Sequence, residues 1–548
     1  MSVNECVDVS SPLMGNERSE SPVSGWWFWR QTFAMNSFRL FIYYLGMTAT
    51  ISVNLLIFFY SNWHGFVSVT EYQWLQTITN IIKYLALLSI PSLTFTFIGH
   101  ILFPPVLRRQ VASLEELSSQ FHHRLFFRIV TRGTNKSLVK QHVKHSWCVL
   151  SKILPSHQFF IEVATDNSQD FIATDVEEVM MMSSVRELVV PKEYQTSTGA
   201  KYKARALQYA IEHSAAKEDD WIVHLDEETR FDAETVRHIL HHCVTESDAI
   251  QRDEKKYGNI GQGTILYGTN EIDNYVTTLA DSVRVGDDLG KFRLQYELHE
   301  PLIGMHGSFV VCHNAVEKEV TFDHGMEGSI TEDAYFALIA RWQKGVKFSW
   351  IDAFMYEQSP FTFGDFMRQR CRWYVGLWLV CMSNAIPVKG RMTLTFFMCT
   401  WASTPLIWIA LVLNIFIDSD ISYGYRMVTS VMAGVSTWGY IVGFLFTFRM
   451  RDGIMRYLGL AILQYVCLPL FAILEMSGVL LGIFRPPVTA FHVVQKEKNP
   501  TMDPNCPLVL SQSNSCLNEI VVTLEGNVNQ NETNNEVVIE LEVGQTQK

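Results

Sequence analysis

The sequence predicts an α/β domain with a mixed, mostly parallel sheet, inserted between transmembrane helices. Hydrophobic residues make up 48% of the 548 residues and charged residues only 18%, against about 25% charged in average soluble domains. Apolar stretches long enough to cross a bilayer lie on both sides of a polar middle region. Within that region short apolar runs alternate with amphipathic segments, which is typical of a parallel sheet flanked by helices.

The chain divides by composition into five parts. We expect a polar tail in residues 1–37, two transmembrane helices in 38–107, one globular domain in 108–392, about three transmembrane helices in 393–485 and a polar, acidic tail in 486–548. The apolar stretches are Leu40–Tyr60, Tyr84–Leu107, Thr393–Ile417, Met427–Phe448 and Tyr457–Phe484. Because the last contains Pro469 and Glu475, both a broken crossing and a re-entrant segment stay open.

Positive charges predict the orientation of the spans. Arg39 precedes the first span, Arg108 and Arg109 follow the second, and Lys389 precedes the third, whereas loops 61–76 and 418–423 contain no Lys or Arg. Since Lys and Arg concentrate in cytosolic loops, the sequence predicts a multi-pass membrane protein whose middle domain faces the cytosol.

Charge and cysteine usage exclude some classes of function. The net charge of −12 argues against nucleic acid as a partner. The ten cysteines are scattered, without a Cys-x-x-Cys pair, so neither a disulfide framework nor a zinc site is expected.

The first two predicted strands of the domain each end in polar residues. Leu125–Val130 leads into Thr131, and Phe159–Ala164 leads into Thr165 and Asp166. In doubly wound sheets ligands bind beyond the carboxyl ends of strands, so Asp166 is a candidate for contacting a nucleotide. A turn-capping role for Asp166 stays open.

A helix beginning near Lys203 and a strand ending in acids follow. On an amphipathic helix Lys203 and Arg205 face either solvent or a site formed with the next motif. In Trp221–Glu228 a buried strand runs directly into the acidic cluster Asp226, Glu227 and Glu228. On an extended backbone Asp226 and Glu228 face the same side, where they suit Mg²⁺ or Mn²⁺ on a diphosphate. The alternative is an acidic start for a helix near Ala233–His242.

Three later motifs supply further candidates. Gly304–Val311 places glycines before a strand, allowing close approach of a ligand to the backbone. Thr331, Glu332 and Asp333 open a predicted helix, where Asp333 is a helix cap or a general base. Gln369, Arg372 and Trp373 share one helical face, which binds a sugar or diphosphate or lies at the membrane surface.

Together, in this order, the motifs resemble those of the inverting family 2 glycosyltransferases, which have a GT-A nucleotide-sugar-binding domain. The resemblance covers roughly residues 120–375. The family's Asp-x-Asp site corresponds to Asp226 and Glu228, with Glu in place of the second Asp, and Thr-Glu-Asp and Gln-x-x-Arg-Trp are both present. The resemblance implies that Asp333 is the catalytic base. It also implies that Asp226 and Glu228 hold Mg²⁺ or Mn²⁺. The expected substrate-binding residues are Asp166, Lys203, Asp226, Glu332, Gln369, Arg372 and Trp373.

More closely, the pattern of spans and the segments SITEDAYFA and QSPFTFGDFMRQRCRWYVGLW resemble the Egghead-type beta-1,4-mannosyltransferases. This resemblance implies GDP-mannose as donor, glucosylceramide as lipid acceptor, a role in glycosphingolipid synthesis and an endoplasmic reticulum or Golgi membrane. Two alternatives stay open: a processive polysaccharide synthase of the cellulose, hyaluronan or mannan type, and a non-catalytic membrane scaffold or transporter.

Overall fold

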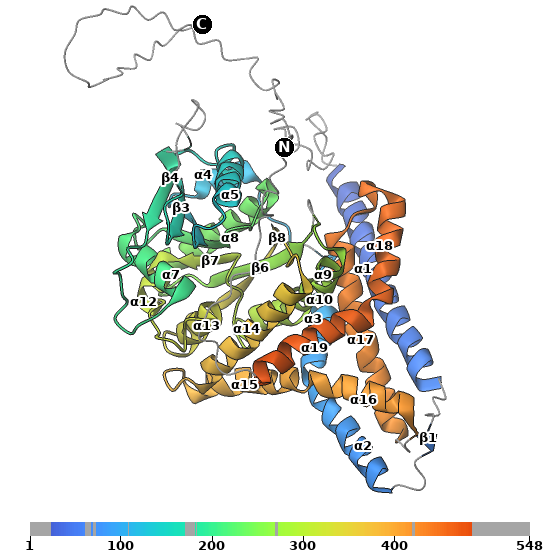
Figure 1. Cartoon of the computed structure of the whole chain (residues 1–548). Coiled ribbons are helices and arrows are strands. Elements are labelled where there is room, and N and C mark those ends of the chain that lie inside the picture. Colours follow the sequence, from blue (N-terminus) through green and yellow to red (C-terminus); the bar gives the residue numbers. More distant parts are fainter. Residues whose placement is uncertain are drawn as a thin grey trace, which may run out of the picture. The chain divides into compact units, whose positions relative to one another are not determined.

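The computed structural model describes residues 24–60, 67–68, 73–107, 109–169, 181, 183–268, 272–418 and 422–484. The predicted tail at 486–548 and most of the tail predicted at 1–37 lie outside these residues. Within them, a sheet domain packs beside a group of long helices (Figure 1).

A seven-stranded sheet forms the centre of the domain. Its strands are β2 (Leu125–Thr131), β3 (Phe159–Thr165), β4 (Val185–Val189), β5 (Trp221–Asp226), β6 (Ile260–Tyr267), β7 (Val310–His313) and β8 (Phe348–Glu357). Their order is β4-β3-β2-β5-β7-β6-β8. Strand β7 runs antiparallel to both neighbours, and every other neighbouring pair is parallel. The predicted mixed, mostly parallel sheet is thus confirmed.

The register of the central strands brings three polar strand ends together. Val130 near the end of β2 pairs with Ala164 of β3 on one side and with Asp226 of β5 on the other. All seven residues of β2 are buried, as expected for a strand covered on both faces. The residues that directly follow these three strands therefore lie at one edge of the sheet.

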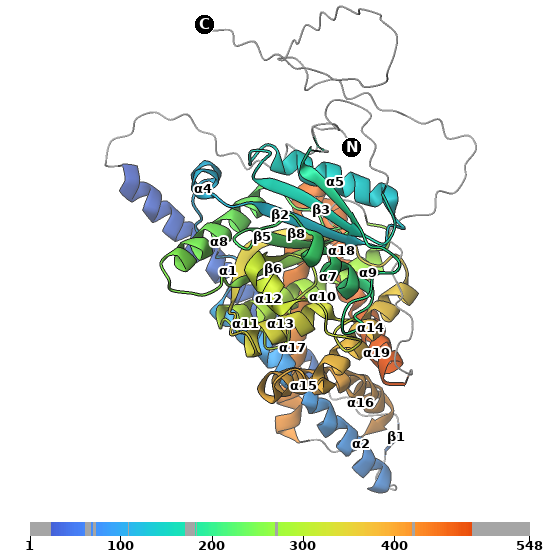
Figure 2. The ribbon, with the colours of Figure 1, turned by 90° about the vertical axis from the view of Figure 1, so that its left-hand side faces the viewer.

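Helices cover both faces of the sheet. α5 (Lys136–Leu150) and α8 (Ala233–Gln251) lie over one face, and α7 (Tyr202–His213), α12 (Asn314–Val320) and α13 (Glu332–Trp342) over the other (Figure 1). The turned view shows α5 lying along β2 and β3 (Figure 2). The remaining elements of this part are α4 (Leu114–Gln120), α9 (Tyr275–Ala280), α10 (Ser282–Asp287), η3 (Asp288–Phe292), α11 (Arg293–Glu297) and α14 (Phe363–Met382).

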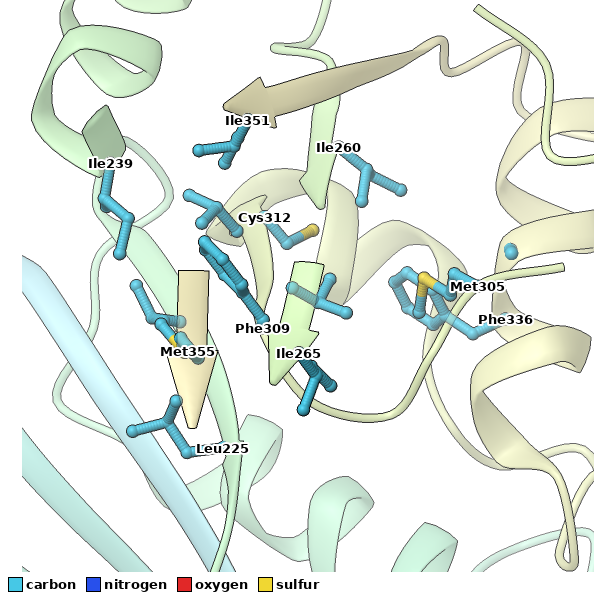
Figure 3. Packing of buried hydrophobic residues seen from close by; sticks show 14 of the residues in the cluster. Leu225, Ile239, Ile260, Ile265, Met305, Phe309, Cys312, Phe336, Ile351 and Met355 are labelled. Atoms are coloured by element: carbon cyan, nitrogen blue, oxygen red, sulfur yellow. The ribbon is translucent and has the colours of Figure 1, made fainter. Parts of the chain in front are cut away.

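The segment before β7 is held against the core by its own apolar residues. Met305 and Phe309 project into the buried cluster, near Phe336 and Ile265 respectively (Figure 3). The ring of Phe309 leaves no room for a side chain at position 263, where a Cβ would lie 2.3 Å from its Cε1 atom. These anchors fix residues 306–308 between them at the edge of the sheet.

The long helices lie outside the sheet domain. They are α1 (Ser24–Tyr60), α2 (Gln73–Ala86), η2 (Leu87–Ser89), α3 (Ile90–Leu102), α15 (Val388–Ala402), α16 (Thr404–Phe416), α17 (Tyr423–Thr447), η4 (Met450–Asp452), α18 (Ile454–Val466) and α19 (Leu468–Phe484), with the short strands β1 (Val67–Ser68) and β9 (Ile417–Asp418). Among the residues that the structure describes, four helical stretches are long and apolar enough to cross a membrane: 36–57, 73–102, 388–410 and 423–447. The pair α18–α19 gives a fifth if it is a single span.

The second span differs most from the sequence expectation, and the last one contains a bend. The second span starts at Gln73 rather than near Tyr84, because α2 continues through Lys83, whose side chain is buried at 1% exposure. The last stretch is bent by 57° between α18 and α19. Pro469 lies just after this bend, and proline disrupts helical hydrogen bonding.

The sheet domain and the long helices meet through direct backbone contact. A Cβ on Gly443 of α17 would lie 1.8 Å from the carbonyl oxygen of Ser282 in α10, and one on Gly286 would lie 2.3 Å from that of Gly439. A Cβ on Gly99 of α3 would likewise lie 2.1 Å from the carbonyl oxygen of Gly290 in η3. Glycine is required here because any side chain would separate the two parts.

Replacing Gly443 by alanine is expected to destabilise the protein, because the added methyl group forces α17 away from α10. Overpacking of this kind costs about 1–3 kcal/mol. Gly459→Ala in α18 is the matched control, since nothing lies within 4 Å of the position that its methyl group would take and alanine favours a helix. Thermal unfolding in detergent should give a lower Tm for Gly443→Ala alone. Equal Tm values for the two variants would contradict the close contact.

Candidate active site

One cavity of about 650 Å³ is lined by every residue that the sequence proposed as a catalytic base, a substrate-binding residue or a metal ligand. It lies at the carboxyl ends of β2, β3 and β5, beside the starts of α7 and α13. Its lining includes Asp166, Lys203, Asp226, Glu228, Glu332, Asp333, Gln369, Arg372 and Trp373. The structure therefore brings together residues from five separate segments of the sequence, while the role of each stays a prediction.

The two proposed metal ligands reach the cavity through a turn. Strand β5 ends at Asp226, and the Thr229 backbone N–H donates to the Asp226 carbonyl at 3.1 Å. The prediction that Asp226 and Glu228 share a face of an extended strand is therefore wrong. The turn, rather than strand alternation, places both of them at the cavity.

Glu227, between these two acids, locks the turn to the neighbouring strand. Its carboxylate accepts hydrogen bonds from Thr131 Oγ1 and from Asn135 Nδ2, the latter at 2.5 Å. Burial raises the pKa of Glu227. This residue thus turns inward to the end of β2, whereas Asp226 keeps 38% of its side chain exposed.

Lys203 lies among the carboxylates of the cavity. Its Nζ donates to Asp226 Oδ1 at 2.5 Å and to the Gly307 carbonyl at 3.0 Å, and it lies 3.5 Å from Glu332 Oε1. Burial alone would lower the pKa of Lys203, but Asp226 and Glu332 raise it above its ordinary value. Lys203 is therefore a fixed cation in the site, and the solvent-facing alternative is wrong.

The start of α13 supplies two adjacent acids. Burial raises the pKa of Glu332 to about 7 and also raises the pKa of Asp333, while Lys203 opposes both shifts. Asp333 Oδ1 accepts the Ala334 backbone N–H at 2.8 Å. Asp333 thus stabilises the first turn of the helix and faces the cavity, so the two alternatives for this residue are compatible. A buried carboxylate with a raised pKa is suited to accepting a proton.

Helix α14 contributes the remaining predicted residues on one face. Arg372 is close enough to the carboxylates of Glu332, Asp226 and Asp333 for them to oppose the lowering of its pKa by burial. The ring of Trp373 has the guanidinium groups of Arg284 and Arg370 at 4.5 and 4.6 Å from its centroid. Cation–π contacts at these distances orient the indole ring.

Asp166 lies at the far side of the cavity, after β3. Its Oδ1 accepts from Arg205 Nη2 at 2.6 Å, and Arg205 also donates to the carbonyls of Pro191 and Tyr194. Arg205 therefore holds Asp166 in place and is not a solvent-facing residue. Asp166 retains 37% exposure of its side chain.

Several charged residues of the cavity were missed by sequence reasoning. His306 Nε2 lies 2.7 Å from Asp288 Oδ1, and both line the cavity. Arg370 donates to Asp281 Oδ1 at 2.5 Å and to Glu475 Oε1 at 2.7 Å. The sequence analysis recognised the segments that contain His306 and Arg370 but not these two residues, because their partners come from distant elements that no local pattern identifies.

The donor set fits a hard divalent cation that shares its coordination with a ligand. Among the described residues, no group of three or more His, Cys, Asp or Glu side chains is placed to hold a metal ion by itself. Asp226 and Glu228 offer carboxylate oxygens at the cavity. Mg²⁺ typically takes one or two protein carboxylates and completes its shell with phosphate oxygens and water.

Comparison with known proteins gives a consistent set of similarities. Residues 221–476 match the family described as glycosyl transferase family group 2. The chain is 35% identical over 436 residues to the beta-1,4-mannosyltransferase egh of Drosophila melanogaster, covering 78% of this chain and 90% of that protein. It is 34% identical over 425 residues to the beta-1,4-mannosyltransferase bre-3 of Caenorhabditis elegans, covering 76% and 88%. A crystal structure of S. aureus TarS residues 1–349 aligns with a TM-score of 0.30 and 12% identity, covering 58% of this chain and 90% of that one.

Proposed function

We propose that this chain, which belongs to the family of beta-1,4-mannosyltransferases that includes egh and bre-3, transfers mannose from GDP-mannose to glucosylceramide. The chain is a glycosyltransferase with a GT-A domain between membrane helices. The proposal adds the donor, the lipid acceptor, a role in glycosphingolipid synthesis, and a catalytic domain on the cytosolic side of the endoplasmic reticulum or Golgi membrane.

One observation carries the proposal: a cationic lysine and four carboxylates line the same cavity at the ends of parallel strands. Asp226, Glu332 and Asp333 surround Lys203 there, and Glu228 lines the same cavity. A nucleotide sugar has a diphosphate that needs positive charge and a sugar carbon that is attacked by a hydroxyl group. The cavity offers both a cation and a carboxylate that can act as the base.

For the donor, we assign Asp166 to the nucleoside and Asp226 with Glu228 to a divalent cation, Mg²⁺ or Mn²⁺. When bound, such an ion would offset the charge of the leaving diphosphate. Lys203 holds Asp226 and contributes positive charge beside it. Gln369, Arg372 and Trp373 form the side of the cavity on α14 and would bind the acceptor sugar or the diphosphate.

For the reaction, Asp333 takes the proton from the acceptor hydroxyl while that oxygen attacks the anomeric carbon of mannose. The bond from this carbon to the diphosphate oxygen breaks in the same displacement, and the α-linked donor gives a β-linked product. Nucleophile and leaving group lie on opposite faces of the sugar, so no covalent enzyme intermediate forms. Glu332, beside the base, contacts substrate.

The test uses purified full-length protein, a panel of nucleotide sugars, and glucosylceramide in detergent, with the lipid product identified by mass. The expected product carries one added hexose and forms with GDP-mannose alone. A polymer would favour the processive synthase, for which the extension of the cavity among membrane helices is the supporting observation. No product with any donor would overturn the proposal.

The rate of transfer is expected to fall at a higher pH than an ordinary aspartate would give, because burial raises the pKa of Asp333 and a protonated Asp333 cannot accept the hydroxyl proton. Burial raises the pKa of both Asp333 and Glu332, the latter to about 7. Raising the pH through this range deprotonates the acids, so kcat/KM should climb and then level off. A pH–rate profile between about pH 5 and pH 9 checks this. A flat profile down to the ordinary pKa of an aspartate would argue against a buried carboxylate base.

A further inference from the structure

The cavity continues from the reacting groups into the region of the membrane helices. Helix α14 forms its connecting wall, because Gln369, Arg372, Trp373 and Leu377 all line it. These positions are three, four and eight residues beyond the first, so they form one continuous helical face. The polar end of this face lies near Asp333, and the apolar end leads away from it.

Three of the membrane helices around the cavity each present one face to it. Leu394, Phe397, Met398 and Trp401 do so from α15, and Thr404, Ile407 and Trp408 from α16. Ala472, Glu475 and Met476 of α19 have the same spacing of three and four residues. Regular helical spacing on three helices indicates an interior wall rather than a chance gap. In Figure 1, α14, α15 and α19 lie side by side beneath the sheet domain.

This membrane-side half of the cavity, defined by the lining residues of α15, α16 and α19, is apolar. Its carboxylate, Glu475, accepts a hydrogen bond from Arg370 Nε at 2.7 Å, and Arg370 is also bound to Asp281. The remaining polar contributions from α15 and α16 are the hydroxyls of Thr400 and Thr404, which donate to carbonyls of their own helix or the one before it. Such a wall suits hydrocarbon and offers few contacts to a polyhydroxylated chain.

We infer that the membrane-side half of the cavity holds hydrocarbon of the lipid acceptor next to its sugar, so that the protein, and not the bilayer alone, surrounds the top of the lipid tail. This inference rests on the proposed lipid acceptor and adds where its tail lies. The apolar wall limits how deeply the lipid enters, and α14 positions the sugar hydroxyl near Asp333. The apolar wall acts by positioning the acceptor and adds little binding free energy, because hydrocarbon that leaves the bilayer for an apolar cavity gains little free energy.

The test fills the membrane-side half with extra atoms. Ala472→Phe, on the cavity face of α19, is compared with Ile473→Phe, whose position is 40% exposed and is not part of the cavity lining. Each variant is assayed with glucosylceramide and with methyl β-glucoside, which has the sugar but no tail. The ratio of the two kcat/KM values should fall about tenfold or more for Ala472→Phe and stay near the wild-type ratio for Ile473→Phe.

A second pair of variants keeps the inference testable if Ala472→Phe fails to fold. Thr404→Phe fills the cavity from α16, with Ile409→Phe on the exposed side of the same helix as its control. In addition, glucosylceramide with a photoreactive group near the start of its acyl chain should crosslink to peptides of α15, α16 or α19. Unlabelled glucosylceramide should compete for this crosslinking.

The outcomes separate this inference from the proposed function. If the wild-type protein forms mannosylated glucosylceramide but cavity-filling variants retain the wild-type ratio, the inference is overturned and the proposed function stands. An equal loss with both acceptors also overturns it, because the effect is then independent of the tail. If the wild-type protein forms no such product, the proposed function itself falls.

Discussion

Asp333→Asn is expected to lower kcat by about 10²- to 10⁴-fold while GDP-mannose still binds. Asparagine has the shape of aspartate and its side-chain oxygen can still accept the Ala334 backbone N–H, so the start of α13 is preserved. It cannot take the acceptor proton at neutral pH. Binding of GDP-mannose by calorimetry, together with turnover under saturating substrates, separates the two properties.

The matched control is Asp365→Asn. Asp365 also lies buried in the first turn of a helix, where it accepts hydrogen bonds from Thr362 and Arg368, but it does not line the cavity. Its substitution removes one negative charge at an equivalent structural position and should change turnover only a few-fold. Turnover of Asp333→Asn within a few-fold of wild type would remove Asp333 from the role of base.

The central strands could be predicted from sequence because burial on both faces makes them continuous apolar runs. The predicted strands Leu125–Val130 and Phe159–Ala164 agree with the structure to within one residue, and the buried strand predicted from Trp221 is also present. The convergence of their polar ends follows from parallel pairing alone. For the same reason, the candidate acids are identifiable as members of one site before any contact is known.

The turn after β5 could not be predicted in the same way. The expectation that Asp226 and Glu228 share a strand face requires the acidic segment to be extended. The strand instead ends at Asp226, and Glu227 in the following turn accepts hydrogen bonds from Thr131 and Asn135 at the end of β2. That interaction joins residues more than ninety positions apart, so no local pattern reveals it.

The membrane side of the site was also beyond sequence reasoning. Glu475 stands out in the sequence as an acid within an apolar stretch, but its partner Arg370 lies 105 residues earlier. Likewise, the π-helix at Asp288–Phe292, which places Asp288 beside His306, has no recognisable sequence signal. Such helices are frequent at functional sites, and here one supplies residues of the cavity wall.

Lys203→Met is expected to lower kcat/KM at neutral pH by about 10²-fold or more, since it removes the fixed cation from a cluster of acids. Methionine matches the length of lysine but leaves Asp226, Glu332 and Asp333 without the ammonium group. Lys203 lowers the pKa of both Glu332 and Asp333, in opposition to burial. Without it both pKa values rise further, so more of the base is protonated at a given pH.

The shift of the pH profile distinguishes this electrostatic effect from a general loss of structure. For Lys203→Met the acid limb of kcat/KM should move to higher pH, and part of the activity should return as the pH is raised, because raising the pH deprotonates the acids. Lys201→Met is the matched control, since Lys201 is exposed and does not line the cavity, and its profile should follow that of the wild type. If Lys203→Met lost activity equally at every pH while its Tm was unchanged, Lys203 would act by binding substrate directly and not by setting the protonation of the base.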